Sequence, residues 1–260
     1  MFADTHCHLD FKELASHLET IKIQLDEKRV GMLVVPSIGR DNWPQVIDIC
    51  SKDSRFYYGL GLHPYFIDKH EINDLSVLAN EIERLKKEGP DKLVAVGEIG
   101  LDFTRPNIEK QISLFEAQLA IADRYKLPVI IHTRKANAET LSSLKKYKVV
   151  GGVIHAFSGS FELMMNYIDL GLKIGVGPVI TWPSASKSRD AIMRAPIGSL
   201  VLETDAPDMS IAGVGRGFGS PLDVCDVFAA LNNIRPEKAP DLERALWNNS
   251  AQLFNKQSCN

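Results

Sequence analysis

Short apolar segments rich in β-branched residues alternate with longer segments of helical periodicity, and this alternation restricts the possible folds most strongly. The predicted strands are residues 1–8, 31–37, 57–63, 93–100, 128–133, 151–156, 172–176 and 199–204. The predicted helices are residues 11–29, 42–52, 75–85, 108–119, 136–147, 161–170, 186–194, 221–232 and 241–254. Strands that alternate with helices pair in parallel through right-handed crossovers. Eight such units in 260 residues predict an α/β fold, a (β/α)8 TIM barrel that forms a single domain over residues 1–260.

An open, doubly wound parallel sheet is the competing architecture. Such a sheet carries a glycine-rich phosphate-binding loop directly after its first strand. In this chain the first predicted strand contains His6-Cys-His and runs on into Leu9-Asp10, a segment without glycine. The barrel is therefore the favoured fold.

The charge balance excludes a protein that holds nucleic acid through a broad basic surface. Lys and Arg total 30 and Asp and Glu total 33, which gives a formal net charge of −3. Proteins of the excluded class are normally more basic. A phosphate-containing substrate remains compatible with this composition, because bound metal ions add positive charge that a residue count does not include.

Cysteine usage and the apolar segments indicate the cell compartment. The cysteines, Cys7, Cys50, Cys225 and Cys259, are scattered and form no Cys-x-x-Cys pair, which is typical of free thiols in a reducing compartment. The first residues lack the basic and apolar regions of a signal peptide. No apolar segment approaches the roughly 20 residues that span a bilayer. We therefore expect a cytoplasmic protein without membrane contact.

Titratable side chains recur at the carboxyl ends of the predicted strands. They include five of the seven histidines and two carboxylates: His6, His8, His63, His132, His155, Glu98 and Asp205. In a barrel these ends converge on the face where active sites are built. The sequence therefore predicts one site assembled from residues that are far apart in the chain. The other two histidines, His17 and His70, lie in helical or polar segments and are expected to be solvated.

His6 and His8 form the sharpest local signal. Residues two apart on a strand share a face, so both imidazoles should point into the barrel while Cys7 points outward. Two neighbouring neutral imidazoles suit a shared divalent cation better than a dry core. The alternative is a pair of structural histidines that hydrogen-bond to each other.

Glu98 and Asp205 strengthen the prediction of a metal site. Each ends an apolar strand, where an unpaired carboxylate would be costly to desolvate. His132 and His155 supply two further nitrogen ligands. Four histidines and two carboxylates exceed what one tetrahedral ion needs, which predicts two divalent cations bridged by a carboxylate. The donor set suits Zn, Mn, Co or Ni, and Mg also serves phosphate chemistry.

Other polar residues near the strand ends have two interpretations each. His63 could contact substrate or hydrogen-bond to a neighbouring loop, and Arg134 could bind an anionic group or form a surface ion pair. Asp10 could orient His6 or His8, but capping the helix that follows is the favoured role. Glu203 is expected to point away from the site, although a twisted strand end would let it support a metal ligand.

Six motifs resemble those of the TatD-type metal-dependent hydrolases, an amidohydrolase-like family of TIM barrels. They are His6-Cys-His-Leu-Asp10, Gly61-Leu-His-Pro64, Gly97-Glu-Ile-Gly-Leu-Asp102, Ile131-His-Thr-Arg134, His155-Ala-Phe-Ser-Gly159 and Glu203-Thr-Asp-Ala-Pro207. The motifs occur in the family's order and, together with the Asn249-Ser-Ala-Gln-Leu-Phe254 tail, cover essentially the whole chain.

The resemblance implies a deoxyribonuclease that removes nucleotides from a DNA 3′ end, with two divalent cations as cofactors. It implies that His6, His8, Glu98 and Asp205 hold one ion and that Glu98, His132 and His155 hold the other. Glu98 would bridge the ions, and His63 matches a position associated with the substrate phosphate. In the metal-assisted hydrolysis that we expect, Asp205 would accept or relay a proton, and Arg134 and His63 would bind the phosphate oxygens. DNA or another phosphate-containing molecule is the expected partner, and a monomer is compatible with the sequence.

The chain departs from the family pattern at two places, which indicates a divergent subgroup. Asp102-Phe-Thr104 replaces the usual Asp-Tyr-Tyr, and a segment that begins at Arg216 replaces Arg-Asn-Glu-Pro. Both departures lie where substrate would be held. Two other functions therefore stay open: hydrolysis of a small phosphoester, lactone or amide, and a metal-binding protein without catalysis.

Overall fold

Eight parallel strands form one sheet in the order β1 to β8. The computed structural model describes residues 1–89, 91–215 and 217–256. The strands are β1 (Phe2–Asp4), β2 (Val30–Pro36), β3 (Phe56–Leu60), β4 (Leu93–Asp102), β5 (Val129–Arg134), β6 (Gly152–Ile154), β7 (Leu172–Val176) and β8 (Leu200–Leu202). Each strand pairs in parallel with the next one along the chain. The predicted TIM barrel is confirmed.

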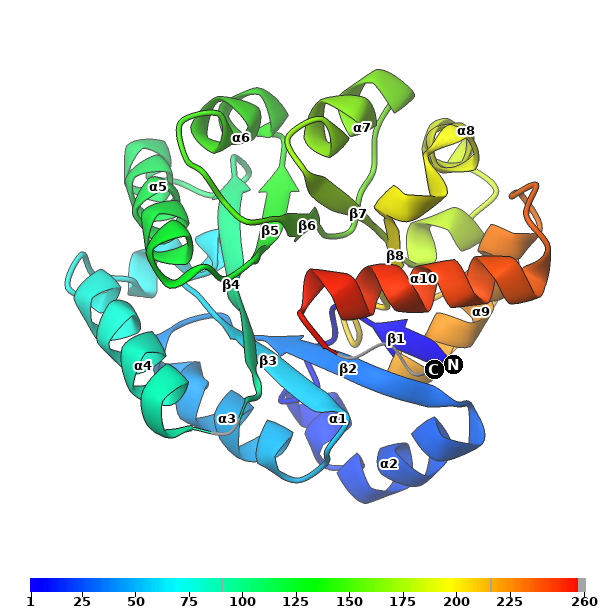
Figure 1. Ribbon diagram of the computed structural model, residues 1–260, viewed down its shortest axis with the longest axis horizontal. Helices are drawn as coiled ribbons and strands as arrows, with labels where there is room; N and C mark the ends of the chain where they lie inside the picture. The colour runs from blue at the N-terminus through cyan, green and yellow to red at the C-terminus, as the bar shows by residue number, and fades with distance from the viewer. Residues whose placement is uncertain (90, 216, 257–260) are drawn as a thin grey trace.

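The helices lie outside the ring of strands (Figure 1). They are α1 (Lys12–Ala15), α2 (Leu18–Glu27), α3 (Trp43–Ser51), α4 (Asp74–Glu88), α5 (Ile108–Tyr125), α6 (Asn137–Leu144), α7 (Phe161–Ile168), α8 (Ser186–Arg194), α9 (Val224–Asn232) and α10 (Ala239–Leu253). Apolar residues at helical spacing fix their orientation. In α4, for example, Leu78, Ile82 and Leu85 are buried along one stripe.

The barrel closes through the extended chain that follows β1. The Thr5 amide donates to the Leu202 carbonyl at 2.9 Å, and the His8 amide donates to the Ala206 carbonyl at 2.7 Å. Cys7 and Ala206 form an isolated parallel bridge. These bonds join the first strand to the last and extend the wall of the barrel beyond both strand ends, toward the face where a TIM barrel carries its active site.

Two apolar layers hold the barrel together. One lies between the strands and the surrounding helices. The other fills part of the barrel interior with strand residues such as Met32, Val34 and Ile130, and it includes Trp247 of α10 and Phe254 just after that helix. The helix α10 therefore lies across one end of the barrel (Figure 1), and the predicted site lies at the other end.

Several predicted boundaries are wrong by a few residues. The strands predicted to end at His8, His63 and Ala156 end before these residues, so the polar side chains lie in the loops that follow. The helix predicted at 11–29 is interrupted between α1 and α2. The helix predicted at 221–232 begins with a 3-10 turn that carries a Ser220–Asp223 capping box.

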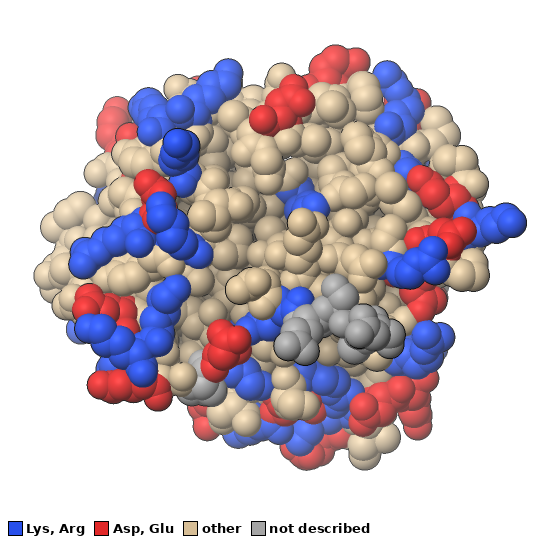
Figure 2. Space-filling model, in the orientation of Figure 1, with Lys and Arg blue, Asp and Glu red and all other residues tan. Residues whose placement is uncertain are grey.

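The described chain contains no helix that is both long and apolar enough to cross a membrane. Its cysteines, Cys7, Cys50 and Cys225, are free thiols, as expected, and Cys259 lies outside the described residues. On the face covered by α10, basic and acidic side chains are interspersed (Figure 2), and neither sign forms a continuous patch.

Candidate metal centre

His6 and His8 lie directly after β1 and point into the barrel. Their Nε2 atoms are 3.3 Å apart, and both side chains are buried. Cys7, between them, packs into the apolar layer outside the barrel. The alternation predicted for a strand therefore persists past the end of β1, because the Cys7–Ala206 bridge keeps this segment extended.

One side of the candidate centre brings four donor atoms together. Glu98 Oε2 lies 3.2 Å from His6 Nε2 and 3.6 Å from His8 Nε2. Asp205 Oδ1 lies 3.5 Å and 3.9 Å from the same two nitrogens. Ligands about 2.1 Å from a tetrahedral ion are about 3.4 Å from one another. These four atoms could therefore hold one divalent cation.

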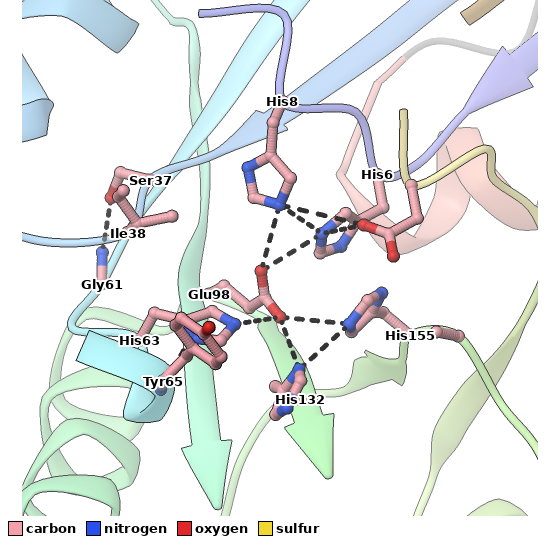
Figure 3. Close-up of polar contacts among 12 residues, drawn as sticks. His6, His8, Ser37, Ile38, Gly61, His63, Tyr65, Glu98, His132 and His155 are labelled. Carbon is pink, nitrogen blue, oxygen red and sulfur yellow. Dashed lines mark hydrogen bonds and ion pairs between the residues drawn. The ribbon is translucent and has the colours of Figure 1, made fainter. Parts of the chain in front are cut away.

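The other carboxylate oxygen of Glu98 faces a different group of histidines. Glu98 Oε1 lies 2.8 Å from His63 Nε2 and 3.1 Å from both His132 Nδ1 and His155 Nε2. His132 Nδ1 and His155 Nε2 are 3.4 Å apart. Figure 3 shows Glu98 between the two groups, with one oxygen directed at each. This second group could hold another cation.

The backbone around Glu98 explains its position. The Glu98 amide donates to the Ser37 carbonyl at 3.0 Å, and the Ser37 hydroxyl accepts from the Gly61 amide at 2.9 Å (Figure 3). Glycine is required at position 61, since a Cβ there would lie 2.6 Å from the Glu98 carbonyl oxygen. The ends of β2 and β3 thus fix the part of β4 that carries Glu98.

A second glycine lets β4 and β5 approach each other beside His132. Gly100 pairs with His132 and has φ 142°, a conformation that other residues rarely adopt. A Cβ at Gly100 would lie 1.9 Å from the His132 carbonyl oxygen. The glycine in the Gly97–Asp102 motif is therefore a packing requirement of the site.

Burial and neighbouring charges shift the pKa values of the cluster in different directions. Burial opposes ionisation of Glu98, but the surrounding histidines hold its pKa well below the usual range. Burial also opposes protonation of His155, yet the charges of Glu98 and Asp205 raise its pKa to about 10. Burial, with a contribution from Glu98, raises the pKa of Asp205 to about 8. Glu98 is the ionised centre of the cluster.

The chemistry of the donor set fits divalent cations. Buried atoms without a hydrogen-bond partner in the described chain include His6 Nδ1, His8 Nδ1, Glu98 Oε2, Asp102 Oδ2, His132 Nε2, His155 Nδ1 and Glu203 Oε2. Among the described residues, the recorded ion pairs of these carboxylates are all with histidine. Buried carboxylates of this kind require a cation or a metal, and imidazole with carboxylate suits several divalent metals.

Asp102 forms an ion pair with His132, a contact the sequence did not reveal. Its Oδ2 lies 3.5 Å from His132 Nε2, on the ring edge opposite Glu98. Its Oδ1 accepts from the amide and hydroxyl of Thr104 at 2.9 Å and 2.5 Å. Burial opposes ionisation, but His132 and Thr104 hold the pKa of Asp102 well below its usual range. A carboxylate in this position fixes the imidazole tautomer and raises its basicity as a ligand.

The Asp102→Asn variant is expected to bind divalent metal about 10- to 100-fold more weakly, because the amide cannot hold His132 in the same tautomer. Competition with a chromogenic chelator measures the affinity. Asp190→Asn is the matched control, since Asp190 pairs with Arg194 on the surface of α8. Equal affinity in both variants would contradict the role of Asp102.

Glu203 is turned toward the cluster. Glu203 is the first residue after β8, and its amide still donates to the Val176 carbonyl of β7 at 3.1 Å. Glu203 Oε1 accepts from the Ala156 amide at 2.5 Å and lies 3.9 Å from His155 Nδ1. A Cβ at Gly175 would lie 2.2 Å from Glu203 Oε2, so glycine makes room for this carboxylate. Glu203 thus contacts His155, which agrees with the supporting role that the sequence analysis gave as the alternative.

The remaining predicted residues have different surroundings. Arg134 lines the cavity and is exposed, without a recorded ion pair among the described residues. Asp10 does not cap α1, and Asn42 Nδ2 donates to its side chain at 2.8 Å. His70 is buried rather than solvated, and its Nε2 bonds to the His63 carbonyl at 2.9 Å. Arg216 lies outside the described residues.

The cluster forms the floor of a cavity of about 440 Å³. Aromatic residues Phe11, Tyr65 and Phe66 form part of its wall, and exposed Asp208 also lines it. The sequence analysis did not single out these four residues. Asp208 directly follows the Glu203–Pro207 motif, and Tyr65 directly follows the Gly61–Pro64 motif. Their position next to these motifs could have identified both as residues near the site.

Comparison with known proteins gives consistent matches over the whole chain. Residues 3–255 match the protein family described as TatD related DNase. The chain is 41% identical over 257 residues to the metal-dependent hydrolase YjjV of Escherichia coli strain K12, with 98% of each protein covered. It is 35% identical over 263 residues to a metal-dependent hydrolase of Haemophilus influenzae, with 97% of this chain and 99% of the relative covered.

Solved structures agree with these matches. The crystal structure of YjjV, described as a TatD homologue, superposes with a TM-score of 0.93 at 40% identity and covers 98% of both chains. A TatD-family hydrolase from Entamoeba histolytica superposes with a TM-score of 0.85 at 20% identity, also over 98% of both chains. The second likeness concerns the fold alone.

Proposed function

Because this chain belongs to the TatD-related DNase family, we propose that it is a divalent-metal-dependent deoxyribonuclease that removes nucleotides from the 3′ end of a DNA strand. Its relatives in the family are metal-dependent hydrolases, and this coarser function applies to the chain itself. DNA as the partner, a monomeric state and a cytoplasmic location stay predictions.

The position of Glu98 is the observation that carries the proposal. Its two oxygens face two separate groups of donor atoms, which is the arrangement that a bridging carboxylate needs. Two-metal sites with ions about 3.5–4 Å apart recur in nucleases and phosphatases. We therefore assign Glu98 as the bridge, His6, His8 and Asp205 to one ion, and His132 and His155 to the other.

Two bound divalent cations would supply a water that ionises near neutral pH and would neutralise charge on the phosphate. Proton transfer and binding of the phosphate depend on side chains of the protein. Asp205 is placed to accept a proton from the attacking water and pass it on, since it lies at the cavity floor beside His6 and His8. Arg134, at the cavity wall, is placed to bind the non-bridging phosphate oxygens.

His63 has two uses in this proposal. Its Nε2 contacts Glu98 Oε1, and its Nδ1 accepts a hydrogen bond from the Tyr65 amide at 3.0 Å. These contacts fix the ring at the side of Glu98 that faces His132. From there His63 could join the second group of ligands or bind a substrate phosphate.

A nuclease assay tests the proposal. Single-stranded DNA labelled at its 5′ end is incubated with the protein and Mg²⁺ or Mn²⁺, with and without EDTA. We expect successive shortening from the 3′ end that EDTA abolishes, because the substrate is attracted by the cations rather than by a basic surface. Intact DNA under all metal conditions would contradict the proposal.

A small phosphoester, lactone or amide is the second candidate, because the cavity of about 440 Å³ is of a size that fits a small molecule. A panel of 4-nitrophenyl phosphodiesters, lactones and amides, assayed beside DNA, distinguishes the two candidates by kcat/KM. Turnover of any of these substrates excludes the third candidate, a metal-binding protein without catalysis.

A further inference from the structure

One aromatic side chain is exposed at the wall of the cavity. Tyr65 is 42% exposed, although its ring lines the same cavity as the metal cluster. It lies two residues after His63 on the 3-10 turn Pro64–Lys69. Its amide donates to His63 Nδ1, so the backbone of Tyr65 is tied to the cluster while its ring remains accessible.

Arg105 holds the Tyr65 ring in place. Its guanidinium carbon lies 4.2 Å from the ring centroid, a cation–π geometry. Its Nε also donates to the Tyr65 carbonyl at 3.1 Å. Phe66 packs edge-on against the same ring, with centroids 5.2 Å apart. Tyr65 is therefore oriented by a cation on one face and by an aromatic edge.

An exposed, oriented ring beside a phosphate-binding centre matches the chemistry of single-stranded nucleic acid. Bases that are not paired stack on aromatic side chains, and all four bases have a π-face, so this recognition tolerates any sequence. A paired base is already stacked within its duplex and is not available to the ring. Lys69, over the Phe66 ring at 5.5 Å, adds positive charge on the same turn.

We propose that Tyr65, oriented by Arg105, is a stacking platform for an unpaired base next to the scissile phosphate. This inference rests on the proposed nuclease function and deepens it by naming how the substrate is positioned. Tyr65 is a positioning residue: it selects strand ends whose bases are unpaired and leaves the chemistry at the phosphate to the cluster.

Abasic substrates test the platform. Single-stranded oligonucleotides carry a normal or an abasic residue at the terminal or the penultimate position, and kcat/KM is measured for each. In the wild type, removing the stacked base should lower kcat/KM about 10-fold, the scale of one base–aromatic stack. Tyr65→Leu should lose this preference and cleave the abasic substrate at the wild-type rate, whereas Tyr65→Phe should keep the preference.

A binding measurement gives a second readout. The base 2-aminopurine loses fluorescence when it stacks, so a quench on rapid mixing before cleavage is expected with wild type and Tyr65→Phe. Tyr65→Leu should remove the quench, and Arg105→Gln should reduce it. If Tyr65→Leu retains both the quench and the preference for a base, the platform is wrong although the nuclease function stands. If the wild type cleaves none of the oligonucleotides, both proposals are wrong.

Discussion

The Glu98→Gln variant is expected to lose hydrolysis by about 10³-fold or more in kcat/KM. The amide preserves the size of the side chain but removes the negative charge between the two donor groups. Metal ions stabilise the charge of the transition state by several kcal/mol, and losing this stabilisation lowers kcat/KM by a factor of this order. The metal content of the purified variant, measured by elemental analysis, should fall below that of the wild type.

Glu81→Gln is the matched control for this experiment. Glu81 lies on α4 and pairs with Arg84, so the same chemical change occurs far from the cluster and should leave activity and metal content unchanged. Circular dichroism of both variants establishes that the fold is retained. If the folded Glu98→Gln variant hydrolyses substrate as fast as the wild type, Glu98 does not bridge two metal ions.

The fold and the membership of the cluster were readable from the sequence because their signals are local. Alternation of strands with helices predicts the barrel, and the barrel predicts that strand ends meet on one face. His6 and His8 lie on one face even though β1 ends at Asp4. Side chains two residues apart share a face wherever the backbone is extended, whether or not it belongs to a strand. Glu98 lies within β4, which continues to Asp102, rather than at the end of the strand as predicted.

The supporting contacts were not readable because they depend on three-dimensional geometry. Asp102 reaches His132 through the register of β4 against β5, and a sequence does not specify register between strands. The strand β8 ends at Leu202, two residues earlier than predicted, and Glu203 just beyond it faces His155. His70 is buried because a loop folds back on the carbonyl of His63.

The Asp205→Asn variant separates two roles of this carboxylate, metal ligand and proton acceptor. Asp205 has φ 52°, in the left-handed region, where asparagine is tolerated as well as aspartate. The substitution therefore changes charge without straining the backbone. We expect kcat to fall about 10²- to 10⁴-fold, the range for loss of general acid–base catalysis. The second donor group is intact, so metal content should fall less than in Glu98→Gln.

Leaving-group dependence decides between the two roles of Asp205. If Asp205 passes a proton to the departing oxygen, the loss should be smaller on a 4-nitrophenyl phosphodiester than on a nucleotide, because 4-nitrophenolate leaves without a proton. If Asp205 is a ligand alone, both substrates should lose the same factor. Asp190→Asn, on the surface of α8, is the control. An equal loss on both substrates would therefore contradict the proton-transfer role and leave Asp205 as a ligand, since its Oδ1 would still complete the group formed with His6 and His8.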